Sequence, residues 1–297
     1  MRPLVAVSSA LLALAFGGDQ WHTQAALPVA RTEVAAATVG REIAVVGGYL
    51  ADGSSSRRVD FYSPSTDVWR RGPDLPAAVN HAAATVSRGL LYVAGGYGAE
   101  RSLFVLRGTT WQMLALPAPR AAAGAAAYRG VVYVVGGVAE RGLARSMLAF
   151  DTRSRRWRTL PGPKPRQHLA VAAARGRIYA VAGRTAGFDT NMTLAQSWAP
   201  GETRWRRETP VPQARGGTGS AAIGRTIVSV GGEAPSGTLR AVYGYDVTRR
   251  GWNRLPDLPT PRHGLGVAAL DGVVYVIGGG PQPGLHVTGA NESLRIR

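Results

Sequence analysis

The chain has 297 residues and contains no cysteine, which excludes disulfides, zinc-thiolate centres and a cysteine nucleophile. Hydrophobic residues make up 45% and charged residues 18%, a balance that allows a sizeable core and excludes wholesale disorder. The formal charge is +17, and Lys164 is the only lysine among 35 basic residues. Because the arginines are spread along the chain without a dense basic run, we expect a solvated arginine-rich surface and no nucleic-acid partner. An acidic glycan is the alternative partner for this charge.

The first 18 residues have the pattern of a secretory signal peptide. Arg2 supplies a positive charge, residues 4–16 form an apolar run, and Ala15 and Gly17 place small residues where signal peptidase reads them. The run is too short to span a bilayer. We therefore expect cleavage near Gly17 or Gly18, no membrane span, and a location in the periplasm or outside the cell. A buried helix at the start of an unprocessed chain is the alternative.

Two landmarks repeat along the rest of the chain at a fixed distance from each other. The first is a glycine pair, at Gly47-Gly48, Gly95-Gly96, Gly136-Gly137, Gly231-Gly232 and Gly278-Gly279, with Ala182-Gly183 in the fourth unit. The second is a tryptophan, at Trp21, Trp69, Trp111, Trp157, Trp205 and Trp252. Each tryptophan stands 25 or 26 residues before the next glycine position. Six matched units of this kind predict six copies of one supersecondary motif.

Each unit contains four predicted strands. The first is small and apolar, as at 33–39 and 264–270, and the second is a buried run that ends in the glycines, as at 91–96. The third alternates in hydropathy, as at 147–151, and the fourth starts at the tryptophan and runs into a proline-rich loop, as at 252–262. A four-stranded sheet cannot bury both faces alone, so the units are predicted to stack around an axis.

The two ends of this region predict how the ring of sheets closes. Residues 21–27 form a tryptophan strand with no unit before it, and residues 290–296 form a third strand with no tryptophan after it. Pairing these two strands would complete the last sheet and remove two exposed edges. The fold class is therefore predicted as all-β, a six-bladed β-propeller over 19–297 with four antiparallel strands per blade and the sixth blade closed by the N-terminal strand.

These residues resemble the kelch-repeat superfamily. The shared features are the glycine pair, the tyrosine three residues before it, as in Tyr133, the tryptophan at its fixed distance, and a Pro-Arg before the first strand. The resemblance covers roughly residues 20–297 and is closest to exported bacterial kelch-repeat proteins. It implies that a ligand or partner sits over the central channel, on the face formed by the segments that lead into the first strands and the loops after the glycines. It does not imply an activity, because function depends on sites grafted onto a fold.

One set of candidate site residues stands sixteen positions before the first glycine of each unit. We call it the arginine row; it comprises Arg31, Arg120, Arg166, Arg215 and Arg262, with Val79 in the second unit. Five arginines in a ring could bind an anion through bidentate contacts. The alternative is that each arginine is a structural residue of the family that bonds to the neighbouring blade.

The resemblance implies that the next two positions point into the channel mouth. The polar residues fifteen positions before the glycine are Thr32, Asn80, Gln167 and His263. The residues fourteen positions before it form what we call the channel row: Glu33, His81, Ala122, His168, Gly217 and Gly264. Arg184 and Glu233 join them from the loops after the glycines. We expect no metal here, because distances across a ring of blades should exceed ligand spacing; contact with a ligand and ordinary channel polarity remain the alternatives.

The chain contains no nucleophile elbow, phosphate loop or metal-spacing motif. We therefore expect a monomeric, non-enzymatic binding module that contacts a protein or glycan through the channel face and needs no cofactor. The alternative is a sugar-active enzyme of the sialic-acid mutarotase type, in which Glu33, His81 and His168 would supply the acid and base. A scaffold without a small-molecule site is the third possibility. Galactose-oxidase-type copper chemistry is excluded, because its Tyr-Cys cofactor needs a cysteine.

Overall fold

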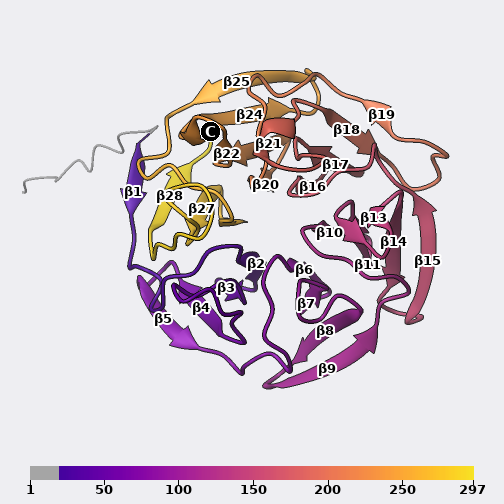
Figure 1. Ribbon diagram of the computed structural model, residues 1–297, viewed down its shortest axis with the longest axis horizontal. Helices are drawn as coiled ribbons and strands as arrows, with labels where there is room; N and C mark the ends of the chain where they lie inside the picture. Colours follow the sequence, from indigo (N-terminus) through magenta and orange to yellow (C-terminus); the bar gives the residue numbers. More distant parts are fainter. Residues whose placement is uncertain (1–19) are drawn as a thin grey trace, which may run out of the picture.

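The structure is a computed structural model that describes residues 20–297, so the predicted signal peptide at 1–18 lies outside the described residues. Within residues 20–297, six four-stranded antiparallel sheets surround a central axis, which confirms the predicted six-bladed propeller (Figure 1). From the axis outward, blade 1 consists of β2 (Ala35–Val39), β3 (Glu42–Val46), β4 (Val59–Ser63) and β5 (Val68–Arg71). Blade 2 consists of β6 (Ala83–Ser87), β7 (Leu90–Ala94), β8 (Ser102–Arg107) and β9 (Thr110–Ala115). Blade 3 consists of β10 (Gly124–Tyr128), β11 (Val131–Val135), β14 (Ser146–Asp151) and β15 (Arg156–Pro161).

In the same order, blade 4 consists of β16 (Ala170–Ala174), β17 (Arg177–Val181), β18 (Ala195–Trp198) and β19 (Arg206–Arg207). Blade 5 consists of β20 (Gly219–Ile223), β21 (Thr226–Val230), β24 (Val242–Asp246) and β25 (Gly251–Leu255). Blade 6 consists of β26 (Gly266–Leu270), β27 (Val273–Ile277), β28 (Asn291–Arg295) and β1 (Trp21–Thr23). The sixth blade therefore combines both ends of the described chain, as predicted. In its register Trp21 lies opposite Leu294 and Thr23 opposite Glu292.

The innermost strands line the channel with small side chains. Below the mouth, the channel widens into a cavity of about 260 Å³ lined mostly by alanine, valine, serine and threonine from β2, β6, β10, β16, β20 and β26. Larger side chains would not fit where six sheets converge on one axis. The second strands are buried on both faces; in β3, residues 43–46 are all 0% exposed.

The hydrophobic core is divided into clusters that lie between neighbouring blades. One cluster joins Val46 and Phe61 of blade 1 to Leu91 and Phe104 of blade 2, and comparable clusters fill the other blade interfaces. Tryptophans add a polar link across five of these interfaces, because each indole N–H donates to a carbonyl at or just after the end of the outermost strand of the preceding blade: Trp21 to Pro256, Trp69 to Ala25, Trp111 to Pro73, Trp205 to Pro161 and Trp252 to Thr209. The repeated tryptophan therefore both packs and bonds between blades.

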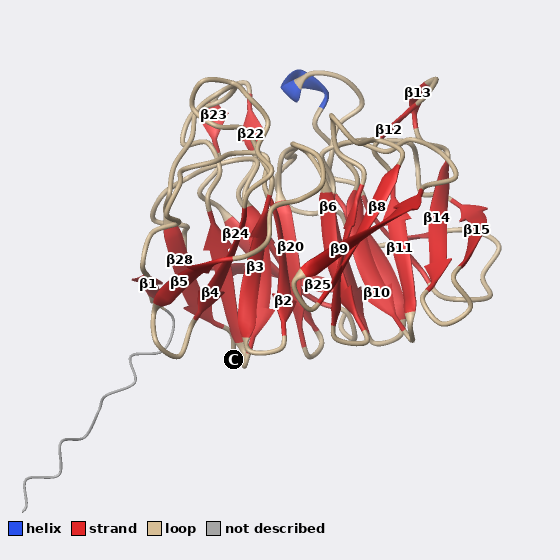
Figure 2. Ribbon diagram, turned by 90° about the horizontal axis from the view of Figure 1, so that it is seen from below, coloured by secondary structure: helices blue, strands red, loops and turns tan. Residues whose placement is uncertain are grey.

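The two ends of the channel differ in structure (Figure 2). One end, which we call the loop face, carries the lead-in segments and the loops after the glycines. These loops include the hairpins β12 (Val138–Ala139)–β13 (Gly142–Leu143) and β22 (Glu233–Ala234)–β23 (Gly237–Thr238), and the 3-10 helix η1 (Phe188–Thr190). The opposite end, the turn face, carries short turns between strands. Any elaborate binding surface at a channel end therefore lies on the loop face.

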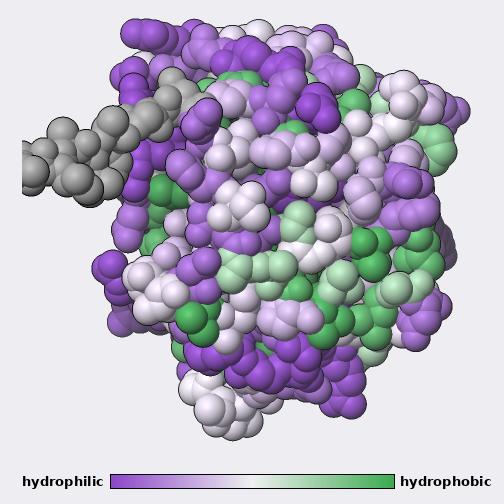
Figure 3. All heavy atoms as spheres, turned by 90° about the vertical axis from the view of Figure 1, so that its left-hand side faces the viewer, coloured by the Kyte–Doolittle hydropathy of each residue, from purple (hydrophilic) through white to green (hydrophobic). Residues whose placement is uncertain are grey.

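The outer side of the ring agrees with the predicted solvated, arginine-rich surface. Around β1 and β5 it is mainly hydrophilic, with small separate apolar areas (Figure 3). Arg70 and Arg71 of β5 have side-chain exposures of 54% and 47%, and both pair with a nearby carboxylate. Among residues 20–297 the structure contains no helix with the length and hydropathy needed to cross a membrane.

Candidate functional site

The arginine row lies beneath the loop face, inside the blades, and does not reach the channel mouth. Its five side chains are 0 to 2% exposed. Arg166 shows the common arrangement: Nε donates to the Ala182 carbonyl at 2.6 Å, and Nη2 donates to the Ala180 carbonyl at 2.9 Å. Both sequence-based readings of this row need correction, because the side chains are closed to an outside anion and bond within their own blade instead of to the neighbouring one. The corrected residues are Arg31, Arg120, Arg166, Arg215 and Arg262.

Each buried arginine joins neighbouring strands of its own blade, at the loop-face end, through hydrogen bonds to backbone carbonyls. Four of the five donate to the carbonyl of the residue at the first glycine position, as Arg262 does to Gly278 at 2.8 Å. Two also have a carboxylate partner, Asp60 for Arg31 and Glu292 for Arg262. Burial lowers the pKa of Arg166 to about 10, which still leaves it protonated at neutral pH. The row therefore supplies fixed, buried charges that hold the strands of each blade together, although Nε of Arg31 and of Arg120 has no hydrogen-bond partner within residues 20–297.

The channel row has one backbone conformation in all six blades. Its φ angles are all positive, between 50° and 64°, in the left-handed region that non-glycine residues rarely adopt. Backbone hydrogen bonds link the row from blade to blade: His81 N to Glu33 O, Ala122 N to His81 O, His168 N to Ala122 O, Gly217 N to His168 O, Gly264 N to Gly217 O, and Val34 N to Gly264 O. This closed belt sets the width of the channel mouth.

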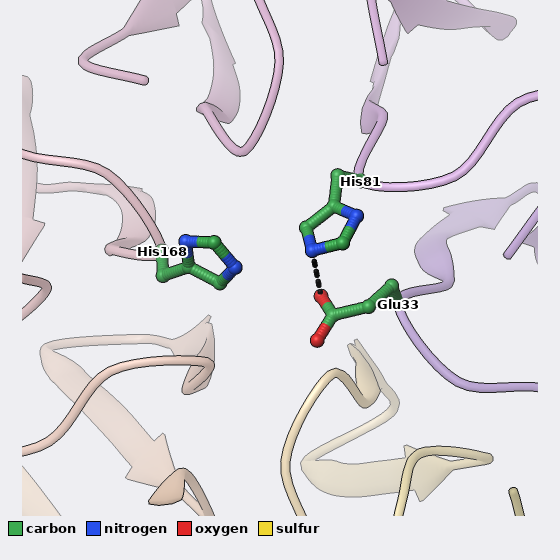
Figure 4. Close-up of side chains that lie close together, drawn as sticks. All are labelled: Glu33, His81 and His168. Carbon is green, nitrogen blue, oxygen red and sulfur yellow. Dashed lines mark ion pairs between the residues drawn. The ribbon is translucent and has the colours of Figure 1, made fainter. Parts of the chain in front are cut away.

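The belt brings side chains from non-adjacent blades into contact. His81 of blade 2 and His168 of blade 4 have ring centroids only 4.9 Å apart. Nε2 of His81 lies 3.2 Å from Oε2 of Glu33, and one ligand atom from each of the three residues lies within 4.8 Å of the other two (Figure 4). The expectation that distances across the ring would exceed ligand spacing is therefore wrong for Glu33, His81 and His168.

Asn80 fixes the orientation of His81. Its amide Nδ2 donates to Oγ of Ser55 at 2.7 Å, which leaves Oδ1 as the acceptor that faces the imidazole. Oδ1 lies 2.5 Å from Nδ1 of His81. Nδ1 therefore carries a proton, and Nε2 is the ring nitrogen that faces Glu33. Tyr49 and Tyr97 pack edge-on against the same ring.

His263 connects Glu33 to the rest of the mouth. Its Nδ1 lies 3.2 Å from Oε1 of Glu33 and 3.7 Å from Oε1 of Glu233, which in turn accepts a 2.6 Å bond from Arg184. Nε2 of His263 lies 3.1 Å from the carbonyls of residues 282 and 284, so the same ring also supports the loop after β27. Arg184 and Glu233 are 9% and 3% exposed, which places them in the wall of the mouth behind the channel row. Gln167 is half-buried beside them.

The pKa values of these groups favour Glu33 as the anion of the mouth. Burial would raise the pKa of Glu33, but the charges of His81 and His168 and its hydrogen bond with His263 hold it well below its usual range. Burial lowers the pKa of His168 to about 3 and also lowers that of His81, although Glu33 opposes both shifts. Burial would lower the pKa of His263 as well, but Glu33 and Glu233 outweigh it and raise that pKa.

The space above these residues is small. The cavity lined by the channel row holds about 80 Å³, room for a few water molecules and well below the roughly 300 Å³ at which small-molecule sites begin. Glu33 is also already engaged by two histidines. The mouth can therefore hold water or an ion, whereas a sugar ring would not fit between the proposed acid and base.

Sequence reasoning missed three exposed apolar side chains on the loop face. Tyr97, Phe188 and Leu285 are 36%, 42% and 48% exposed, and they belong to the loops after the glycines of blades 2, 4 and 6. Tyr97 directly follows a glycine pair, but nothing in the sequence marks its side chain as exposed. Phe188 and Leu285 lie in loops whose lengths differ from blade to blade, so alignment to the glycines does not reach them.

Comparison with known proteins gives relatives over most of the chain. Kelch-like protein terF of Aspergillus terreus is 32% identical over 257 residues, which cover 78% of this chain and 46% of that protein. Kelch repeat protein M-T8 of Myxoma virus is 31% identical over 131 residues, 41% of this chain and 25% of the viral protein. Human Kelch repeat and BTB domain-containing protein 12 is 33% identical over 96 residues, 28% of this chain and 15% of the human protein. The chain thus spans less than half the length of these relatives.

The family comparison agrees with the glycine and tryptophan pattern. The family described as the KLHDC2/KLHL20/DRC7 Kelch-repeats domain matches residues 33–207. This match covers more than half of the chain and includes the channel-row residues of the first four blades. The chain therefore belongs to the Kelch-repeats domain family.

Proposed function

We propose that this chain is a non-enzymatic binding propeller that acts outside the cytoplasm and holds a protein ligand on its loop face. Kelch propellers are generally protein-interaction domains, which supports a protein as the ligand. The location is supported by the apolar run at 4–16 and the small residues that follow it. The small volume of the channel mouth favours a protein over a monosaccharide.

The observation that carries this proposal is the distribution of exposed apolar side chains. Of the five large hydrophobic residues that are exposed within residues 20–297, three lie in loop-face loops around the channel: Tyr97, Phe188 and Leu285. Aromatic and large aliphatic residues that converge on one face are typical anchors of protein interfaces. Their origin in three alternate blades places them around the mouth instead of in one groove.

Hydrogen bonds link the loop of blade 4, which carries Phe188, to the loop of blade 5, and the loop of blade 5 to that of blade 6, which carries Leu285. Asn191 Nδ2, beside η1, donates to the Glu233 carbonyl of the next blade at 2.6 Å. Thr238 Oγ1, in the hairpin β22–β23, donates to the Pro281 carbonyl in the loop of blade 6 at 2.9 Å. Loops held in this way lose little conformational entropy on binding, so the face is organised before the ligand arrives.

The binding test compares two sets of exposed apolar residues on the same chain. Tyr97, Phe188 and Leu285 are replaced together by alanine, and the control replaces Val68 and Met113, which are 57% and 64% exposed in outer strands. A partner captured from the extracellular and envelope fractions is purified and titrated against both variants. We expect the loop-face variant to weaken binding by about 100-fold or more and the control to change it by less than about threefold. Equal losses in both variants, or none in the loop-face variant, would contradict the proposal.

The location is tested separately by expressing the full chain with a C-terminal epitope and fractionating the cells. We expect the epitope outside the cytoplasm on a chain that starts at Gly18 or Asp19, as read by N-terminal sequencing. When Leu11 and Leu12 in the apolar run are replaced by arginine, we expect the chain to remain longer in the cytoplasm. A cytoplasmic chain that still begins at Met1 would refute export while leaving the binding surface untouched.

A further inference from the structure

Three side chains at the channel mouth present nitrogen and oxygen atoms at the spacing of a metal coordination sphere. In a tetrahedral site with bonds of 2.0 to 2.1 Å, neighbouring ligand atoms are roughly 3.3 Å apart. Nε2 of His81 and Oε2 of Glu33 are 3.2 Å apart, so one edge of such a site is already formed. His168 completes a set whose ligand atoms all lie within 4.8 Å of one another.

The hydrogen bonds behind His81 direct its Nε2 into this set. Asn80 accepts from Nδ1 and is itself fixed by Ser55, so Nε2 is the ring nitrogen that is left to face the carboxylate. An imidazole lone pair and a carboxylate oxygen repel each other at 3.2 Å unless a cation lies between them. That cation is either a proton or a metal ion. An outer-shell acceptor on the far nitrogen is the usual arrangement behind a metal-bound histidine.

His168 is available as a second imidazole ligand. Its Nδ1 is buried and has no hydrogen-bond partner within residues 20–297, an uncommon state for a polar atom that calls for an explanation. A ring nitrogen points toward Glu33 across the channel (Figure 4). Within the described residues, no hydrogen bond to Nδ1 opposes a rotation of this ring that would shorten the remaining distance.

The rest of the channel row leaves room for the ion and its water. Ala122, Gly217 and Gly264 have no polar side chain, and the cavity they line with the three ligands holds about 80 Å³. Gly264 is needed for the position of the carboxylate, since a Cβ there would stand 2.6 Å from Oε1 of Glu33. The mouth is thus shaped around Glu33 with space beside it.

We propose that Glu33, His81 and His168 bind one divalent transition-metal ion, with water in the remaining position. Two imidazoles and one carboxylate suit Zn²⁺, and the absence of thiolates disfavours softer ions. His263 would continue to bind the other oxygen of Glu33, which orients the carboxylate. The site goes beyond protein binding on the loop face and does not depend on it.

The test uses the full chain purified without a histidine tag and treated with a chelator. Zn²⁺ is titrated by calorimetry, and Co²⁺ is added as a spectroscopic probe of coordination. We expect one equivalent of Zn²⁺ to bind and Co²⁺ to give the intense visible bands of four-coordinate sites. His168→Ala should abolish the binding, and Asn80→Ala should weaken it by about 10- to 100-fold, as loss of an outer-shell partner does.

The matched control is the double variant His22→Ala, His286→Ala, which removes the two exposed histidines outside the mouth. It should bind Zn²⁺ as tightly as the unaltered chain. Loss of binding in this control, or full binding in His168→Ala, would show adventitious surface binding only and overturn the proposal. If a variant fails to fold, measurements on the unaltered chain still test the metal site. Either the absence of Zn²⁺ binding or a six-coordinate Co²⁺ spectrum would mean that Glu33 and His81 share a proton instead of a metal ion.

Discussion

The arginine row and the channel row lie two residues apart in the same segments, and they behave in opposite ways. The arginine row repeats one residue type in five blades, and every copy is buried against carbonyls of its own blade. The channel row repeats one backbone conformation in six blades but carries glutamate, histidine, alanine and glycine. A repeated residue type here marks a structural task. A repeated backbone with varied side chains marks the place where the fold leaves room for a site.

The largest expected effect comes from breaking the arginine row. Arg262→Ala removes donors to the carbonyls of Gly278 and Val276 and leaves Glu292, which is 4% exposed, without its buried partner. Loss of one member of a buried ion pair costs about 3–5 kcal/mol in the free energy of unfolding. Urea denaturation followed by tryptophan fluorescence measures this loss.

The control for this variant is an arginine whose ion pair is exposed. Arg101 bonds to Glu140 at 3.0 Å, with side-chain exposures of 55% and 71%. Arg101→Ala should lower the free energy of unfolding by no more than about 1 kcal/mol, as for other surface pairs. If the two variants lose the same stability, the arginine row has no special structural role and the contrast with the channel row fails.

The same contrast explains what the sequence could predict. Glycine pairs and tryptophans have the same local role in every blade. The glycines form a left-handed turn, as at Gly47-Gly48, and the indole packs between two sheets. Counting these residues therefore predicts six blades and how the ring closes. The arginines share backbone partners, but their side-chain partners differ in residue type: Arg31 has Asp60, and Arg166 has Gln196. The sequence pattern therefore locates the row without showing that it is buried within its own blade.

The width of the mouth could not be predicted for a related reason. It depends on the left-handed backbone of the channel row, which Glu33, His81, Ala122 and His168 adopt without being glycine. No residue pattern marks that conformation, because the belt of bonds between blades imposes it. Side chains of blades 2 and 4 consequently meet across the channel, a contact that counting residues along each blade does not reveal.

A smaller effect sharpens the comparison through pH, because the arginine row keeps its charge and the channel row does not. The folded pKa of His168, about 3, lies below its ordinary value near 6.5. As the pH falls below about 6.5, the unfolded chain takes up a proton that the folded chain excludes, so the free energy of unfolding decreases by about 1.4 kcal/mol per pH unit for one such group. His81 shifts in the same direction.

The other charged groups that face His168 leave a pH range in which they contribute little to the pH dependence of the free energy of unfolding. His263 has a raised pKa, so its contribution is present in full below about 6.5 and is lost only as the pH rises through its folded value. Glu33 has a lowered pKa, and its contribution is lost only when the pH falls below about 4.3. Arg184, the other cation that acts on His168, forms an ion pair with Glu233. We therefore expect the free energy of unfolding of His168→Ala, measured in the presence of a chelator between pH 4.5 and 6.5, to depend less steeply on pH than that of the unaltered chain. His286→Ala should keep the slope of the unaltered chain. Equal slopes in all three proteins would place the titrating group outside the channel row.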